Sequence, residues 1–210
     1  MANLKQAMRT GAREEAERAI LAAAEGVFAM HGYSGTTMAA VAAAAGLPKP
    51  NVHYYFATKA ELYRAVIGRV FNAWLSAADA FDTADEPLEA LASYIGAKMD
   101  LARAMPLASK IWANEIMRGA PNIQDFLETT LSDWVKSREA VLLRWIAQGK
   151  LRAIEPRPLF YMIWATTQQY ANAAHEIATL EGGELDGAAF ARAKRQVTDI
   201  IVSGVMPRGR

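Results

Sequence analysis

The first third of the chain has an apolar pattern with a helical period. From Glu14 to His31, apolar side chains recur every three to four residues, which places them on one face of an amphipathic helix. The positions on that face are Ile20, Ala24, Val27 and Phe28. Gly32 follows directly, and glycine is common just beyond a helix end. The pattern therefore predicts a helix over residues 14–31.

Two short helical segments follow, with a glycine between them. Thr36 and Thr37 are both suited to the N-cap of the first, because a threonine hydroxyl accepts a hydrogen bond from a backbone N–H there. This helix is predicted over Met38–Ala45 and ends at Gly46. The second is predicted over Pro50–Phe56, since proline is well placed at the first helical position. Two short helices joined by a tight turn are typical of a helix-turn-helix.

The rest of the chain also has helical patterning. Thr58 and Glu61 have the spacing of a capping box, which begins a longer helix toward Phe81. The polar stretch Asp82–Glu86 is expected to be a linker, and Pro207–Arg210 a frayed tail. Five further helical blocks are predicted over Leu88–Ala104, Pro106–Arg118, Ile123–Gln148, Pro156–Leu180 and Asp186–Gly204. No segment resembles a strand, so we expect an all-α fold of about nine helices, three short ones followed by a larger bundle.

Composition narrows the classes of protein. The chain has 210 residues and no cysteine, which excludes disulfides, thiolate zinc sites and a cysteine nucleophile. Residues 1–13 are polar and basic, unlike a secretory signal. No apolar run reaches the roughly 20 residues that span a bilayer. We therefore expect a soluble, cytoplasmic protein with no membrane partner.

The charges are unevenly distributed. The net charge is only +1, but no Asp or Glu occurs between Gly26 and Ala60, where Lys49 and Lys59 are the only charged residues apart from histidines. One interpretation is a small apolar helical unit that needs few charges. The other is a face kept free of acids because it meets a polyanion such as DNA.

The residues around the two short helices decide between these interpretations. They read HGYSGTTM over 31–38, VAAAAGL over 41–47 and KPNVHYYFATKAEL over 49–62. This motif resembles the DNA-binding domain of TetR family transcriptional regulators over roughly residues 14–70. The resemblance implies a flexible arm over 1–13, a helix-turn-helix domain over 14–60 and a ligand-binding and dimerisation domain over 61–210. Pro48 and His53 depart from the family pattern, which usually has a serine cap and a tyrosine there.

The chemistry of these residues suggests how each would meet DNA. The hydroxyls of Thr36 and Thr37, with the helix-start amides, would hold a phosphate. Base edges are expected within reach of the start of the recognition helix, and Tyr54 would reach a phosphate or a thymine methyl. That helix start carries Lys49, Pro50, Asn51 and His53. Lys59 is a poor partner for a helix N-terminus, and a phosphate between it and the amides would relieve the conflict.

The second domain carries a further resemblance. The stretches SKIWANEIMRGAP over 109–121 and MIWATTQQYA over 162–171 look like the pyrimidine-utilisation (Rut) regulator branch of the family, which responds to uracil and thymine. A regulator of the same fold that senses a different small ligand is the alternative.

Helical spacing gives this effector site a partial physical basis. Five residues fall on one face of the predicted helix over 156–180, namely Tyr161, Trp164, Gln168, Asn172 and His175. An aromatic plate beside two carboxamides suits a flat amide-like ring, and Trp74 could join the same site. The alternative is a core stripe with satisfied amides. Lys98 and Glu115 are candidates for charges of the effector site, but a salt bridge is the favoured interpretation for both.

The last helix completes the predicted architecture. Its apolar stripe consists of Phe190, Val197, Ile200 and Ile201. The family resemblance makes this stripe, with the helix from Pro156, the seam of a homodimer. The expected partners are therefore a near-palindromic DNA operator, a second copy of the chain and a small-molecule effector.

Two other classes of protein fit the sequence less well. A helical enzyme is disfavoured because the three histidines are far apart in sequence and no catalytic or phosphate-binding motif is present. No metal site or cofactor is expected. A helical adaptor without DNA binding is disfavoured by the acid-free segment. The sequence therefore predicts a ligand-responsive transcriptional regulator of the repressor type.

Overall fold

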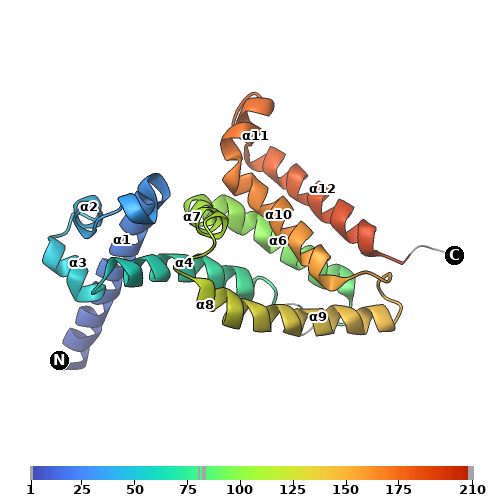
Figure 1. The fold of residues 1–210 in the computed structure, drawn as a ribbon, viewed down its shortest axis with the longest axis horizontal. Coiled ribbons are helices and arrows are strands. Elements are labelled where there is room, and N and C mark those ends of the chain that lie inside the picture. Colours follow the sequence, from blue (N-terminus) through green and yellow to red (C-terminus); the bar gives the residue numbers. More distant parts are fainter. Residues whose placement is uncertain (1, 80, 82–83, 208–210) are drawn as a thin grey trace. The chain divides into compact units, whose positions relative to one another are not determined.

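The computed structural model describes residues 2–79, 81 and 84–207, and within them it contains helices and turns but no strand (Figure 1). The all-α prediction is confirmed. The helices are α1 (Ala2–Gly35), α2 (Met38–Ala44), α3 (Lys49–Tyr55), α4 (Lys59–Ser76), α6 (Pro87–Ala104), α7 (Pro106–Met117), α8 (Gln124–Phe126), the π-helix η1 (Leu127–Leu131), α9 (Ser132–Ala147), α10 (Pro156–Asn172), α11 (Ala174–Leu180) and α12 (Gly187–Val205).

The first helix follows the predicted face but is longer than predicted. Ile20, Ala24 and Phe28 are buried, as the periodicity indicates, while the backbone is helical from Ala2 onwards. Regular helical geometry is interrupted at Gly32, whose φ of 66° and ψ of 178° favour a residue without Cβ. The predicted stop is therefore a kink, with one more turn beyond it to Gly35. The flexibility expected of residues 1–13 stays a prediction.

The turn between α2 and α3 is a Schellman motif. The Gly46 N–H donates to the Ala43 carbonyl and the Leu47 N–H to the Ala42 carbonyl, at 3.1 and 3.0 Å. Gly46 has a φ of 65°, which the motif requires at this position and which glycine adopts without a Cβ penalty. This turn ends α2 abruptly and lets α3 leave in a new direction.

The recognition helix α3 begins one residue earlier than predicted. Lys49 is its first residue and Pro50 its second, with Pro48 at the N-cap. Pro48 provides no side-chain cap, so its backbone carbonyl alone meets the helix start by accepting from the Asn51 N–H at 2.9 Å. A proline in the first turn costs nothing here, because N–H groups in that turn have no intrahelical partner.

The capping box of α4 is confirmed. The Glu61 N–H donates to the Thr58 hydroxyl at 3.1 Å, and the Glu61 carboxylate accepts from the Ala57 N–H at 2.9 Å. The helix ends at Ser76 rather than near Phe81. Part of the predicted linker, residues 82–83, and the last three residues of the predicted tail lie outside the described residues.

Two predicted blocks have internal breaks. The block over 123–148 is helical as predicted, although η1 inserts a π-helical segment before α9. The block over 156–180 is two helices, because Ala173 adopts φ −111° and ψ 30° between α10 and α11. Residues on opposite sides of Ala173 therefore do not share the single helical face that the sequence suggested.

The chain divides into two compact units. The first contains the residues up to 70 together with 110–122, and the second contains 71–109 and 123 onwards. In the first unit, α1, α2, α3 and the start of α4 are joined by most of α7, a segment that the sequence places with the second half. In the second unit, α10 and α12 both pack against α6 around a core that includes Tyr94, Trp145 and Phe160.

No helix among the described residues is long and apolar enough to cross a membrane.

Candidate DNA-binding surface and effector site

Helix α3 separates its buried and exposed residues cleanly. Val52 on the helix and Phe56 just after it are buried, which confirms the predicted core face. The side chains expected to meet DNA all point away from the core: Lys49, Pro50, Asn51, His53 and Tyr54 are exposed. Such a helix, held by its apolar face and polar on the other, can enter the major groove with side chains free to reach base edges.

The two threonines at the start of α2 have different roles. The Thr37 hydroxyl accepts from the Ala40 N–H at 3.1 Å and is the N-cap. Thr36 is buried, and its hydroxyl donates to the Gly32 carbonyl at 2.8 Å. The predicted phosphate contact through the Thr36 hydroxyl is therefore wrong, because this group is committed to the kinked end of α1. Thr37 remains a candidate.

Lys59 has partners that the sequence did not reveal. Its ammonium donates to the carbonyls of Tyr33 and Thr36 at 2.8 and 3.0 Å, and it lies 4.5 Å from the centroid of the Tyr33 ring. These oxygens relieve the unfavourable position of a cation at a helix start without any phosphate. Lys59 thus ties the end of α1 and the residue that follows it to α4, and is a positioning residue rather than a free cation.

Two contacts hold the exposed side chains of α3. The His53 Nδ1 lies 3.2 Å from the Ala57 carbonyl, so Nδ1 carries the proton in that bond and Nε2 is left for another partner. The Tyr54 ring packs edge-on against Tyr55, and the Arg13 guanidinium lies 6.0 Å from its centroid. Sequence reasoning did not assign Arg13, which brings a further cation from α1 to the recognition helix.

A buried polar cluster lies in the same unit. The Glu115 carboxylate of α7 accepts from the Tyr63 hydroxyl at 2.9 Å and from the Asn122 backbone N–H at 2.7 Å. Burial and the neighbouring carboxylate raise the pKa of Tyr63. The salt bridge predicted for Glu115 is replaced by these neutral donors. Because Tyr63 also packs against Phe28 and Tyr33, the cluster joins α7 to the helices of the DNA-binding domain.

The predicted effector residues in the second unit differ in their surroundings. Trp74 is buried, while Trp164 is half-buried and donates from its indole N–H to the Tyr94 hydroxyl at 2.7 Å. The Tyr161 ring lies against Trp164 but is 55% exposed. The Asn172 amide oxygen is occupied by a hydrogen bond from Ser109 at 3.1 Å. Gln168 is half-buried and keeps its place as a candidate.

His175 does not share a site with the other predicted effector residues. It lies on α11, beyond the break at Ala173, and lines a cavity of about 440 Å³ with Arg103, Tyr170 and Phe190. None of the other predicted effector residues lines that cavity. The prediction that His175 belongs with them is wrong, because it assumed one continuous helix.

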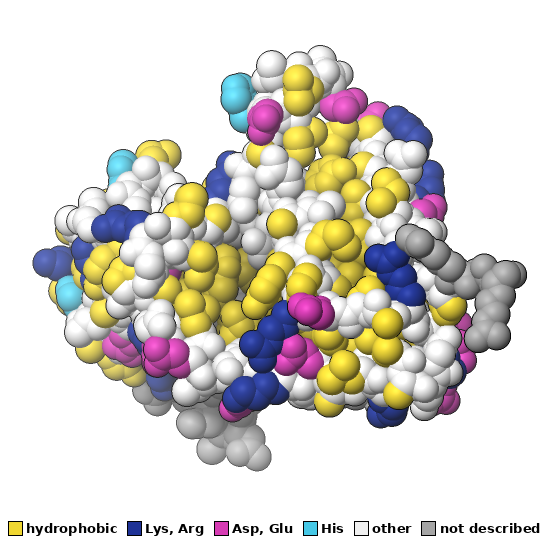
Figure 2. Space-filling model, turned by 45° about the vertical axis from the view of Figure 1, so that its right-hand side comes forward, with side chains coloured by type: hydrophobic (Ala, Val, Ile, Leu, Met, Phe, Trp, Pro, Cys, Tyr) yellow, Lys and Arg dark blue, Asp and Glu magenta, His cyan; other side chains and the backbone are white. Residues whose placement is uncertain are grey.

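The predicted dimer stripe is mostly internal. Phe190 and Ile201 are buried within their own chain, and Val197 packs partly against the same core. Only Ile200 is exposed, at 70%. The apolar stripe of α12 is thus its core face, which corrects the assignment of Phe190 and Ile201. Figure 2 shows hydrophobic side chains gathered where α10 and α12 lie. Tyr161 and Met162 are exposed side chains of α10.

The combination of a helix-turn-helix unit with a larger helical unit defines a class of protein, the DNA-binding transcriptional regulators. Comparison with known proteins specifies the family. Residues 20–66 match the family model described as bacterial regulatory proteins of the tetR family, and residues 67–208 match that of the YcdC-like protein C-terminal region. The chain belongs to the TetR family of transcriptional regulators.

Individual relatives agree with this assignment. The HTH-type transcriptional regulators RutR of Escherichia coli K12 and of Shigella flexneri are each 36% identical over 204 residues, covering 95% of this chain and 96% of theirs. Among solved structures, the ketosteroid transcriptional regulator KstR2 of Mycobacterium tuberculosis superposes with a TM-score of 0.71 at 20% identity, covering 93% of this chain and 95% of that chain. The TetR family regulator PfmR from Thermus thermophilus superposes with a TM-score of 0.70 at 18% identity, covering 90% and 96%. These relatives are regulators, so the prediction that the chain is not an enzyme is confirmed.

Proposed function

We propose that this regulator binds a near-palindromic DNA operator as a homodimer in the cytoplasm and releases it when a small molecule binds the second unit. The observation that carries the proposal is the exposed polar face of α3, opposite the buried Val52, within a stretch that contains no acidic residue. A dimer would present two such helices to two half-sites about one helical turn of DNA apart. Thr37 and Arg13 would add phosphate contacts.

The dimer seam we propose uses the outward faces of α10 and α12. Tyr161, Met162 and Ile200 supply the exposed apolar side chains of these two helices. A two-fold axis between two copies would place the same faces against each other, as an isologous interface requires.

For the effector we propose a small planar ring compound, with uracil and thymine as the first candidates. The likeness of residues 109–121 and 162–171 to the pyrimidine-utilisation branch and the 36% identity to RutR support this choice. Gln168 and the indole of Trp164 offer a carboxamide beside an aromatic plate. A different small ligand on the same fold is the second candidate. Of the other predicted effector residues, Asn172 is bonded to Ser109, His175 lines a separate cavity and Tyr161 is exposed.

Coupling between the effector and DNA requires that the ligand bind the two states of the regulator with different affinity, typically by about 1–3 kcal/mol. Helices α4 and α7 each contribute residues to both units. We propose that these two helices transmit the effect of the ligand to the DNA-binding unit.

An electrophoretic mobility experiment tests the DNA-binding part. Duplex fragments from upstream of the gene are expected to be retarded, with affinity that falls steeply as salt is raised. Absence of any retardation at low salt contradicts the proposal. Titration of uracil and thymine, followed by tryptophan fluorescence and by release of the DNA, tests the effector part separately.

A further inference from the structure

Lys98 is a lysine in the apolar stripe of a helix. It lies on α6 at helical spacing from buried residues before and after it, and only 2% of it is exposed. The other members of this stripe are Ala90, Leu91, Tyr94, Ile95, Met99 and Ala102. A lysine is almost never fully buried unless it is paired. Its position therefore requires an explanation that packing alone does not provide.

Three buried polar groups of this unit have hydrogen-bond partners, and none of these partners is Lys98. The Tyr94 hydroxyl meets the Trp164 indole, Ser109 meets Asn172, and the Thr167 hydroxyl donates to the Ile163 carbonyl. Among the described residues, the Lys98 ammonium has no hydrogen bond and no ion pair, so the salt bridge expected for Lys98 from the sequence is wrong. Its contact is with the Trp74 ring, whose centroid lies 4.0 Å from Nζ.

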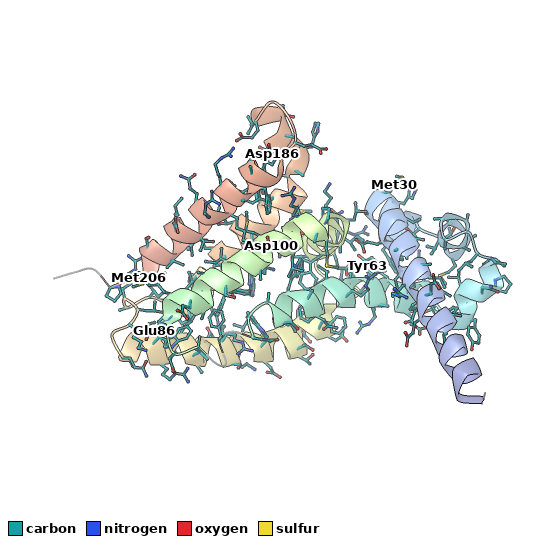
Figure 3. The ribbon with its side chains drawn as sticks, turned by 180° about the vertical axis from the view of Figure 1, so that it is seen from behind. Met30, Tyr63, Glu86, Asp100, Asp186 and Met206 are labelled. Atoms are coloured by element: carbon teal, nitrogen blue, oxygen red, sulfur yellow. The ribbon has the colours of Figure 1, made fainter. Side chains whose placement is uncertain are left out.

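The surrounding charges do not compensate Lys98. The carboxylate nearest in sequence is that of Asp100, which Figure 3 labels. It is two positions beyond Lys98 in the helix, so it lies on another side of α6, and it pairs with Lys194 of α12. Burial is the only cause that lowers the pKa of Lys98, to about 7. Other titratable groups contribute nothing to that shift, among them Tyr94 and Asp100 on α6 itself and Tyr161, Tyr170 and Lys194 on the helices that pack against α6. The amine is thus a buried base with a cation–π contact and no counter-ion.

We infer that Lys98 is a ligand-binding residue of the effector site, and that the effector is a small planar ring compound that presents an anionic group to the Lys98 ammonium. This inference rests on the planar-ring effector of the proposed function, and it replaces the neutral uracil and thymine as first candidates by an anionic ring compound of the same class. A buried charge is costly unless an opposite charge meets it, and an anionic effector supplies that charge. The indole of Trp74 holds the ammonium on its other side.

Pairing of Lys98 with an anionic ligand links ligand binding to the uptake of a proton by Lys98. An anion that pairs with Lys98 favours the ammonium form, so binding takes up a proton wherever the free site has lost it. Affinity for an anionic ring compound is therefore expected to fall as the pH rises through about 7. A neutral ring has no such requirement, and its affinity is expected to change little over the same range.

The test is titration calorimetry of the full-length protein with uracil, which is neutral, and with its 6-carboxylate, which is an anion throughout. The wild type is expected to prefer the carboxylate and to bind it roughly twentyfold more weakly at pH 8.5 than at pH 6.5. Measurement in two buffers of different ionisation enthalpy should show proton uptake. In Lys98→Met both the preference and the proton uptake are lost, whereas Lys136→Met, which changes an exposed lysine, retains them.

The outcomes separate this inference from the proposed function. If Lys98→Met binds both compounds as the wild type does, or if the wild type prefers uracil without pH dependence, the inference is overturned and the planar-ring effector stands. If neither compound binds a protein that still retards its DNA fragment, the planar-ring effector and the inference both fall, while the DNA-binding part remains. Thermal unfolding of Lys98→Met verifies that the variant is folded, because methionine packs in an apolar stripe at least as well as lysine.

Discussion

The Tyr63 hydroxyl donates a hydrogen bond of 2.9 Å to the Glu115 carboxylate, and both residues are buried although 52 positions separate them in sequence. Tyr63, which Figure 3 labels, comes from α4, and Glu115 comes from α7. The bond thus holds residues 110–122 in the same compact unit as the helix-turn-helix. A change in α7 would therefore reach α4 directly, and α4 begins at the end of the DNA-binding motif.

Tyr63→Phe should lower the free energy of unfolding by about 1.5–3 kcal/mol, because it removes a donor from a buried carboxylate. Urea denaturation measures the change. Tyr54→Phe is the matched control, since this tyrosine is exposed and loss of its hydroxyl should cost under about 0.5 kcal/mol. Equal effects of the two substitutions would mean that the Tyr63 hydroxyl contributes no specific bond.

Lys49→Ala should weaken DNA binding and reduce the salt dependence of the binding constant. Lys49 is exposed at the first position of α3, and loss of one cation from the DNA-binding surface is expected to lower the salt slope by about 1. Fluorescence anisotropy with a labelled duplex at several salt concentrations is the measurement. Lys136→Ala removes an equal charge from α9 and should leave the slope unchanged.

Gln168→Ala should impair the response to the effector and spare DNA affinity in its absence. The half-buried carboxamide is expected to pair with the ring amide edge of the ligand, so the ligand concentration that releases half of the DNA should rise about tenfold or more. Exposed Gln169 on the same helix provides the control, Gln169→Ala. Loss of DNA binding in folded Gln168→Ala protein would argue against separate sites.

Lys98→Met should change how stability depends on pH. In the unfolded chain Lys98 has its ordinary pKa of 10.5 and stays protonated, whereas the folded chain releases that proton above about pH 7. The unfolded state therefore binds more protons between these values, and the contribution of Lys98 to wild-type stability rises with pH by about 1.4 kcal/mol per unit. The excess stability of Lys98→Met over wild type should shrink accordingly from pH 7 to pH 9.

Urea denaturation at fixed protein concentration follows this change, since association would otherwise alter the apparent stability. The exposed Lys136→Met should show a difference from wild type that does not vary with pH. A constant difference for Lys98→Met as well would mean that Lys98 stays protonated in the folded chain.

Ile200→Glu should convert the proposed homodimer to monomers without unfolding them. Ile200 is 70% exposed on α12, so a charge there meets solvent in the monomer but a like charge across a two-fold seam. Light scattering after size-exclusion chromatography measures the mass. Leu143→Glu, a change at an exposed leucine of α9, is the control and should leave the mass unaltered.

Local features of the fold were predictable because they depend on neighbours in sequence. The caps at Thr37 and Thr58, the turn at Gly46 and the buried position of Val52 all follow from spacing and backbone preference. The division of α3 into a buried and an exposed face follows from the same periodicity. The assignment of His175 failed at the break after Asn172, which no glycine or proline marks.

The sequence by itself determined the all-α class, the helix-turn-helix and the exposed face of α3, because helical period and capping are short-range properties. Only the tertiary structure decided the roles of three charged residues. Lys59 is held by the carbonyls of Tyr33 and Thr36 at the end of α1, Glu115 is held by Tyr63, and Lys98 lies against Trp74 without a counter-ion. Whether a buried charge is paired depends on side chains from distant segments, and sequence spacing does not specify which of them meet.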